Sequence, residues 1–432
     1  MPPVAPPAAA ASAPPVGRAS ELVAPPVSAV PGLPVGRASG PAGWVLRGQR
    51  GGHGPRAPLS VLAVVFGLSL LLFAYGWYTS RERPGVSGVP DGYYHGFDQS
   101  GYRSEAQDLA RWRLPARPEK YPFGLGYPAL AVPLLWAGFT RDPFAVPDAL
   151  VFAACVTLVV AIGTHMRSVA FGLGAGGLVA LASPLLGLMV YPWSNTVTAL
   201  AVLVAMAVTV TDREPTWQTG VAVGLAAALA LASRYVDVVF PLAILGFTAV
   251  RAPRRWLKPV AAAVVVVALV GMMIGYTHQR VLGGFFRTPY LLHLDHGTSD
   301  QRLSSYSLGR VPGAGWALFV TGRDAGKRMP ADPLLRLMPW VVLAPAGPLL
   351  LVRRRHPLLW PLLGAAATSV AGTVFYLSFR GAAGFSLVFG SLRYFGPWFG
   401  IWALLTAYAA ACFLDRFEGV DHVGAAGPPG AR

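Results

Sequence analysis

The stretch "RAPRRWLKPVAAAVVVVALVGMMIGYTHQR" (residues 251–280) sets the fold class of this chain. It opens with a cluster of basic residues, Arg251 to Lys258, and continues into an uncharged run at roughly 259–277. A run of about 20 apolar residues in helical form crosses the hydrocarbon core of a bilayer. Basic residues beside such a run stay on the cytoplasmic side. The stretch therefore predicts a membrane-spanning helix whose N-terminal end faces the cytoplasm.

The composition of the whole chain is typical of a membrane protein. Of its 432 residues, 54% are hydrophobic and 12% are charged, whereas soluble domains contain about 25% charged residues. The formal net charge is +16. Its arginines form short clusters between apolar runs, so we interpret them as orientation signals rather than a nucleic-acid surface. Cys155 and Cys412 both lie in apolar runs, which excludes a disulfide framework and a CxxC metal site.

Apolar runs of spanning length recur along the chain and predict an all-α polytopic membrane protein. We expect about ten transmembrane helices, at roughly 58–78, 148–165, 170–189, 193–211, 217–233, 236–250, 259–277, 334–352, 357–378 and 392–414. The Pro-, Ala- and Gly-rich residues 1–57 are expected to form a disordered cytoplasmic tail, and residues 416–432 a second one. The start of the chain lacks the charged and apolar regions of a signal peptide.

The segment "GLGYPALAVPLLWAGF" (residues 124–139) is apolar but short, and it contains two prolines. If it crossed the membrane, the basic cluster at 251–258 would face outward, against its charge. We therefore predict a juxtamembrane helix, in-plane or re-entrant, on the outer face, although a span stays open. This topology makes residues 58–415 one transmembrane domain, with both termini in the cytoplasm and large outer segments at 79–147 and 278–333.

Ionisable residues at the edges of membrane spans are costly, so each is a functional candidate. Such residues, from distant segments, map to the same outer leaflet: Asp98, Lys120, Arg234 and Arg393. Arg234 and Asp237 are three residues apart and share a helix face, so a mutual ion pair is the alternative interpretation. For Arg393 the alternative is a snorkelling side chain within an aromatic belt.

The outer stretch from Asp91 to Pro128 is rich in charged and aromatic residues. A loop tethered between a spanning helix and a surface helix can present a carboxylate to a lipid head group. Asp98 is the candidate general base for an acceptor hydroxyl. The three basic residues of the outer set are candidates to hold a phosphate or diphosphate leaving group. A solvated loop charge is the alternative for any single acid here.

Three motifs together resemble a known family. "FDQSGYRSEAQDLA" is similar to the D-x-x-x-Y-x-x-x-A element after the first span of GT-C class glycosyltransferases, which use polyprenyl-phosphate sugars and include protein O-mannosyltransferases and aminoarabinose transferases. "PEKYPFGLGYPALAVPLLWAGF" resembles their juxtamembrane segment, and "SLRYFGPWFGIWALL" their late R-Y-x-x-P element. The resemblance implies a GT-C-like fold with catalytic Asp98, and substrate-binding residues Tyr102, Glu119, Lys120, Arg393 and Tyr394. Arg234 joins the substrate-binding candidates through its charge at the outer edge of a span.

The chain also departs from that family. Many relatives carry two adjacent acids in the first loop, but Gln99 follows Asp98 here, so no paired-acid motif supports a divalent metal. We assign no metal ligand and no certain cofactor, and a divalent metal stays an open alternative. "LLHLDHGTSDQ" contains His293, Asp295 and His296, which could ligate a divalent ion, but a surface loop is favoured. No soluble outer domain follows the last span, so a large protein-sequon transferase is not expected.

The resemblance implies an inverting glycosyltransferase in the plasma membrane of the cell envelope. Its expected partners are a polyprenyl-phosphate sugar donor, membrane lipids and a glycan, lipid or protein acceptor. The first alternative is a transporter or lipid flippase, for which we find neither a clear internal repeat nor polar groups at the midplane. The second alternative is a structural subunit, in which the arginines anchor helices and the candidate residues lie scattered.

Overall fold

A computed structural model describes residues 56–86, 91–95, 97–114, 124–212, 214–288, 307–321, 332–379 and 392–424. Helices account for all the regular structure within these ranges, which confirms the all-α fold class. The predicted N-terminal tail lies almost wholly outside the described residues. So do Glu119, Lys120 and the His293–His296 motif.

The helices are, in order, α2 (Leu59–Thr79), α3 (Phe97–Ala110), α4 (Gly126–Trp136), α5 (Ala145–Met166), α6 (Val169–Leu181), α7 (Leu185–Met189), α8 (Asn195–Thr211), α9 (Trp217–Ser233), α10 (Val239–Arg251), α11 (Pro253–Leu282), α13 (Val311–Trp316), α14 (Leu334–Leu337), α15 (Ala346–Arg353), α16 (Leu359–Phe379) and α18 (Phe399–Gly424). Short 3₁₀ turns include η1 (Gly92–His95), η3 (Tyr235–Val238), η8 (Pro339–Leu343) and η9 (Gly396–Trp398).

Five of the described helices are long and apolar enough to cross a membrane, namely α2, α5, α11, α16 and the span Gly396–Arg416, which joins η9 to most of α18. The other predicted spans correspond to shorter apolar helices, so the count of about ten remains a prediction. Two predicted spans are interrupted. The run at 170–189 breaks between α6 and α7 at Pro184, and the run at 334–352 breaks at Pro339 and Pro345. Proline ends a helix because it lacks a donor and crowds the preceding turn.

The outer stretch that the sequence suggested was a loop contains helix α3 and turn η1. Helix α3 buries one face: Tyr102, Glu105 and Ala106 are almost fully inaccessible. Asp98 lies in its first turn, where a carboxylate interacts favourably with the helix dipole. The tertiary contacts of this face stabilise a helix whose sequence is too polar to predict one from apolar periodicity alone.

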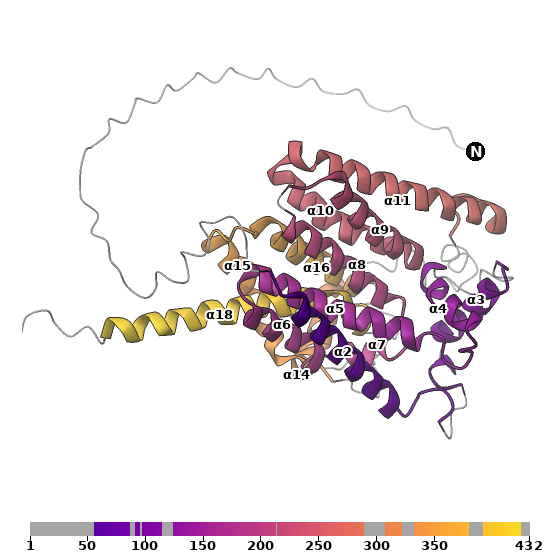
Figure 1. Cartoon of the computed structure of the whole chain (residues 1–432), viewed down its shortest axis with the longest axis horizontal. Helices are drawn as coiled ribbons and strands as arrows, with labels where there is room; N and C mark the ends of the chain where they lie inside the picture. The colour runs from indigo at the N-terminus through magenta and orange to yellow at the C-terminus, as the bar shows by residue number, and fades with distance from the viewer. Residues whose placement is uncertain are drawn as a thin grey trace, which may run out of the picture. The chain divides into compact units, whose positions relative to one another are not determined.

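Helices α9, α10 and α11 lie side by side (Figure 1). Gly220 and Gly224 of α9 bring the backbone of α9 against that of α11. A β-carbon on Gly220 would overlap the carbonyl oxygen of Pro259, and one on Gly224 would lie 2.9 Å from the Cα atom of Ala263. Glycines four residues apart allow close helix contact within a membrane. Helices α3 and α4 lie together at one end of the helices, where α4 also contacts α9 (Figure 1).

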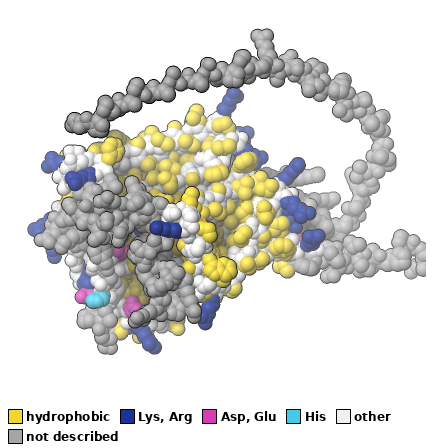
Figure 2. Space-filling view, turned by 180° about the vertical axis from the view of Figure 1, so that it is seen from behind, with side chains coloured by type: hydrophobic (Ala, Val, Ile, Leu, Met, Phe, Trp, Pro, Cys, Tyr) yellow, Lys and Arg dark blue, Asp and Glu magenta, His cyan; other side chains and the backbone are white. Residues whose placement is uncertain are grey.

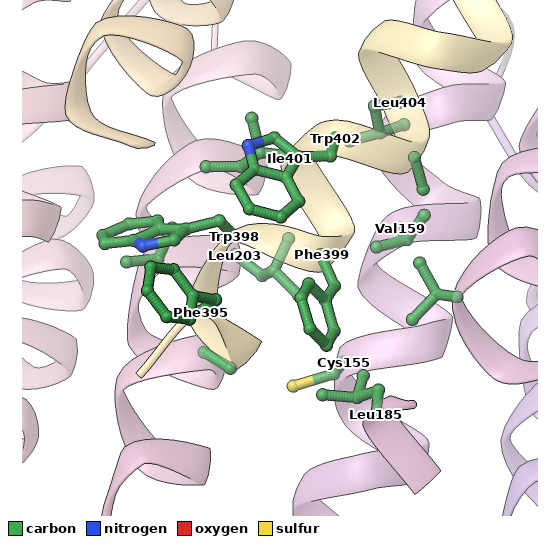
Figure 3. Packing of buried hydrophobic residues seen from close by; sticks show 14 of the residues in the cluster. Cys155, Val159, Leu185, Leu203, Phe395, Trp398, Phe399, Ile401, Trp402 and Leu404 are labelled. Carbon is green, nitrogen blue, oxygen red and sulfur yellow. The ribbon is translucent and has the colours of Figure 1, made fainter. Parts of the chain in front are cut away.

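The core lies between α5, α7, α8 and the start of α18. Figure 3 shows Trp398 and Phe399 packed among Cys155 and Val159 of α5, Leu185 of α7 and Leu203 of α8. Both aromatic side chains are fully buried. This packing fixes the backbone that precedes α18, and with it the position of Arg393.

The outward surface of the helices is apolar. Helices α2 and α11 are mostly exposed and carry large hydrophobic side chains, including Leu68, Leu71, Leu269, Met272 and Met273. Figure 2 shows a broad hydrophobic face with lysine and arginine side chains towards its margins. A surface of this kind is stable against lipid rather than water. The chain is therefore an integral membrane protein.

Candidate active site

Several predicted site residues meet at one end of the helices. Asp98 begins α3, Arg234 follows α9, and Arg393 and Tyr394 precede η9. The start of α8 and the last turn of α16 lie at the same end, because Thr198 and Tyr376 both contact Asp237 beside Arg234. We call this cluster of Asp98, Arg234, Arg393 and Tyr394 the Asp98–Arg393 site.

Asp98 and Arg393 form an ion pair. An Nη atom of Arg393 lies 2.7 Å from an Oδ atom of Asp98, and the two side chains are only 12% and 14% exposed. The Arg393 guanidinium also lies 3.9 Å from the ring centroid of Trp193 and donates a 3.0 Å hydrogen bond to the Tyr394 hydroxyl. The aromatic neighbours expected for a snorkelling arginine are thus present, but the charge is directed at an acid 295 positions away in the sequence.

Arg234 forms the mutual ion pair that the sequence offered as an alternative. Its Nε atom lies 3.1 Å from the carboxylate of Asp237, whose side chain is 1% exposed. The Asp237 carboxylate also accepts hydrogen bonds from Thr198 at 2.6 Å and Tyr376 at 2.7 Å. This acid is therefore well compensated, and it orients Arg234.

Two guanidinium groups flank the ring of Tyr394. The Arg393 and Arg234 groups lie 4.9 Å and 5.4 Å from its centroid. Cation–π contacts hold both cations near one another, although like charges repel. Two neighbouring guanidinium groups present N–H donors of the kind that bind multivalent oxyanions such as phosphate.

Tyr102 joins α3 to the start of α8. Its buried hydroxyl lies 2.9 Å from the hydroxyl of Ser194. Burial raises the pKa of Tyr102, the negative charge of Asp98 raises it further, and the positive charges of Arg234 and Arg393 lower it. All three charged groups therefore act on this phenol. The contact between Tyr102 and Ser194 holds α3, and with it Asp98, against the start of α8.

A shallow cavity lies beside Arg393. Its polar lining consists of Trp193, Asn195, Thr196 and Arg393, and its apolar lining comes mainly from α7. The sequence analysis did not single out Trp193, Asn195 or Thr196, because no motif surrounds them. The one available signal is that Asn195 is the only asparagine among the 432 residues.

Two further acids, Asp142 and Asp148, hold η1 and α4 in place beside the site. The Asp142 carboxylate accepts hydrogen bonds from Trp77 at 2.7 Å and Tyr94 at 2.6 Å. The Asp148 carboxylate accepts from the Tyr127 hydroxyl at 2.9 Å and 3.1 Å. Burial raises the pKa of Asp142. These contacts tie η1 and α4 to the neighbouring ends of α2 and α5, which gives the outer helices a fixed platform.

Glu105 lies on the same buried face of α3 as Tyr102. Burial, together with the nearby charge of Asp108, raises the pKa of Glu105 to about 9. One of its carboxylate oxygens has no hydrogen-bond partner within the described part of the chain. The side chain is therefore a neutral carboxylic acid at physiological pH.

The described residues offer no cluster of three or more His, Cys, Asp or Glu side chains. At Asp98 the position beside the carboxylate is already taken by the Arg393 guanidinium at 2.7 Å. The residues at this point do not fit a divalent metal, and we derive no step through one.

The helical membrane domain has a GT-C-like fold, as the sequence resemblance implied. A crystal structure of ArnT from Cupriavidus metallidurans bound to undecaprenyl phosphate is similar over 85% of this chain and 63% of that chain, with a TM-score of 0.51 and 15% identity. The apo state of the same protein matches over 85% and 62%, with a TM-score of 0.53 and 13% identity.

A second similar structure is the archaeal oligosaccharyltransferase AglB from Archaeoglobus fulgidus, in complex with an inhibitory peptide and a dolichol-phosphate. It matches over 87% of this chain and 52% of that chain, with a TM-score of 0.50 and 14% identity. This chain thus spans between about half and under two thirds of the length of these structures. No family model and no curated protein sequence matches the chain.

Proposed function

We propose that this protein is an inverting glycosyltransferase that moves a sugar from a polyprenyl-phosphate carrier to an acceptor hydroxyl at the outer face of the membrane. The Asp98–Arg393 ion pair carries the proposal, because it joins a candidate base to a candidate phosphate ligand beside a cavity. The GT-C fold and the lipid phosphates bound in the similar structures support it. The convergence of Asp98, Arg234 and Arg393 disfavours a purely structural subunit, for which scattered positions were expected.

The chemistry is a displacement at the anomeric carbon of the donor sugar. The Asp98 carboxylate accepts the proton of the acceptor hydroxyl while the acceptor oxygen forms a bond to the anomeric carbon. The bond between that carbon and the phosphate oxygen breaks, and its electron pair leaves with the polyprenyl phosphate. Attack and departure on opposite faces of the sugar invert the anomeric configuration. General base catalysis of this kind contributes about 10²- to 10⁴-fold in rate.

The ion pair imposes an order on these events. An Asp98 oxygen that holds the Arg393 guanidinium at 2.7 Å is not free to accept the acceptor's proton. The donor phosphate is a second anion, and it can replace Asp98 as the partner of Arg393. Donor binding then releases Asp98 for the acceptor proton only when a leaving group is in place.

The remaining predicted residues have supporting roles in this proposal. Arg234, which Asp237 orients, is the second cation for the phosphate. Tyr394 separates the two guanidinium groups, and Tyr102 positions α3 through Ser194. Glu119 and Lys120, which lie outside the described residues, are proposed from the family resemblance to contact the lipid phosphate.

The opposite end of the helices supports an outward-facing site. There Arg167 and Arg354 both pair with Asp415 of α18, at 2.5 Å and 3.1 Å. These two arginines follow the C-terminal ends of α5 and α15, remote from the starts of α5 and α18. Positive residues of this kind tend to remain on the inner side of a membrane, which supports the proposal that the Asp98–Arg393 site faces outward.

The experiment is a transfer assay with purified full-length protein and a panel of polyprenyl-phosphate hexoses and pentoses. We expect the wild-type protein to release polyprenyl phosphate from one of them, and Asp98→Asn to lose that turnover while remaining folded. Asp91→Asn is the matched control, because Asp91 is an exposed acid of the same outer segment. Lipid flipping by reconstituted protein without any sugar transfer would instead establish the transporter alternative.

A further inference from the structure

Asn195 is a polar residue that the proposed chemistry leaves unused. It is the only asparagine in the chain and the first residue of α8. Its side chain is buried, with the residue 3% exposed, and neither the amide nitrogen nor the amide oxygen has a hydrogen-bond partner within the described chain. Buried amides without partners are costly and uncommon in folded proteins. A group that does not belong to the described chain therefore completes this site.

The position of Asn195 restricts what that group can be. The residue lines the cavity beside Arg393, together with Trp193 and Thr196, while Leu188 and Met189 of α7 form an apolar wall. The cavity is partly open and has room for about one water-sized group. A water-sized polar group therefore reaches the amide without a rearrangement of the helices.

The chemistry of the Asn195 amide further limits which chemical group can bind there. An asparagine side chain both donates and accepts hydrogen bonds. A phosphate offers acceptors alone, and an isoprenoid chain offers neither donor nor acceptor. A hydroxyl offers both in one water-sized group. The neighbouring indole and aliphatic side chains suit the C–H face of a sugar ring.

We propose that Asn195 binds a hydroxyl of the sugar on the lipid carrier, and thereby selects the sugar-linked lipid over the bare lipid phosphate. This inference rests on the proposed function. Arg393 belongs to the same cavity and pairs with Asp98, so the phosphate lies on the arginine side and the sugar on the asparagine side. Ser194, the residue before Asn195, contacts Tyr102 and keeps the amide in register with α3.

The test compares the binding of two kinds of lipid to purified full-length protein in nanodiscs. The probes are polyprenyl-phosphate mannose, glucose and arabinose, each measured against bare polyprenyl phosphate. Asn195→Leu keeps the side-chain size but removes the amide. We expect it to lower the affinity for the preferred sugar-linked lipid by about tenfold, the effect of one hydrogen bond, and to leave the affinity for bare polyprenyl phosphate unchanged.

Two controls separate ligand binding from a structural role. Thr209→Val removes another buried hydrogen-bonding group of α8, and should alter neither affinity. Asn195→Leu should melt at or above the wild-type temperature, because the lost amide has no internal partner. A lower melting temperature, or equal changes for both lipids, or no change for either, would overturn the inference. If the wild-type protein binds neither kind of lipid, the proposed function itself is contradicted and the role of Asn195 falls with it.

Discussion

At the scale of single residues, one face of α3 carries most of the candidate chemistry. Asp98, Tyr102 and Glu105 recur at helical spacing, and each has a different environment. Asp98 pairs with Arg393, Tyr102 contacts Ser194, and Glu105 is buried without a partner for one of its oxygens within the described chain. The same helix therefore presents an ion-paired acid at its start and a buried acid with a raised pKa two turns later.

Glu105 makes the stability of the protein depend on pH. Below its ordinary pKa of 4.5, both the folded and the unfolded chain bind the proton. Between that value and about 9, the folded state alone retains it, so the free energy of unfolding falls as the pH rises. We expect Glu105→Gln, which is neutral at every pH, to melt higher than the wild type at pH 8. The shift should be about 2 °C or more, and it should shrink towards pH 5.

Asp91→Asn serves as the control, because Asp91 is largely exposed on the same outer segment. Differential scanning fluorimetry of the purified variants across this pH range makes the comparison. An advantage of Glu105→Gln that stays constant with pH would mean that the carboxyl is ionised in the folded protein.

The sequence predicted the acids and arginines of the site better than their neighbours. Asp98, Arg234 and Arg393 could be singled out because charge at a membrane edge is costly and therefore informative. Trp193 and Tyr376 could not, because aromatic side chains are frequent along this chain and no spacing marks these two; Asn195 was marked only by being the single asparagine, which names no partner. Only tertiary contacts show that Arg393 faces both Asp98 and Trp193.

At the scale of helices, close contact between backbones depends on glycine. Helix α9 packs against α11 through Gly220 and Gly224, where a side chain would collide with backbone atoms rather than with a flexible side chain. By contrast, Gly177 of α6 has open space around the position of its β-carbon. Glycine therefore has different roles at two helix positions that look alike in the sequence.

This difference yields a prediction for two matched substitutions. Gly220→Val should destabilise the protein by about 1–3 kcal/mol, the usual cost of overpacking, because α11 must move away from α9. Gly177→Val should cost less than about 1 kcal/mol. The melting temperature and the size-exclusion profile in detergent measure the effect. Equal losses for both variants would show that the α9–α11 contact is not close in solution.

Helix positions were predictable from apolar run length, whereas helix interruptions and α3 were not. The spans at 148–165 and 357–378 correspond to α5 and α16, because both runs are long and uninterrupted. The run at 170–189 is equally apolar, but Pro184 divides it. The sequence analysis treated α3 as a loop because the segment is largely charged and polar. Its helix is stabilised by the packing of Tyr102 and Ala106 against α4 and α8, which the sequence pattern does not show.

At the scale of the whole molecule, the two ends of the helices differ in charge chemistry. One end holds the Asp98–Arg393 site, and the other holds the cluster of Arg167, Arg354 and Asp415. The fold class could be predicted from composition and apolar runs, and the GT-C-like fold from three short motifs. Orientation in the membrane rests on the positive-inside rule and calls for a direct test.

Cysteine labelling provides that test. Cys155 and Cys412 are both buried, so the wild-type protein should give little background. We expect His95→Cys, at the exposed last position of the otherwise buried turn η1, to react with a membrane-impermeant maleimide on intact cells. Arg353→Cys, at the exposed end of α15, should react only after permeabilisation. The reverse pattern would place the Asp98–Arg393 site in the cytoplasm.

The central claim is that Asp98 and Arg393 divide the work of transfer between proton acceptance and phosphate binding. The most direct measurement is the turnover rate and the donor Kd of Asp98→Asn and Arg393→Gln, with the lipid-linked sugar that the wild-type protein uses. The account predicts that Asp98→Asn loses about 10²- to 10⁴-fold in turnover with donor affinity retained, while Arg393→Gln loses donor affinity. Wild-type turnover by Asp98→Asn would contradict it.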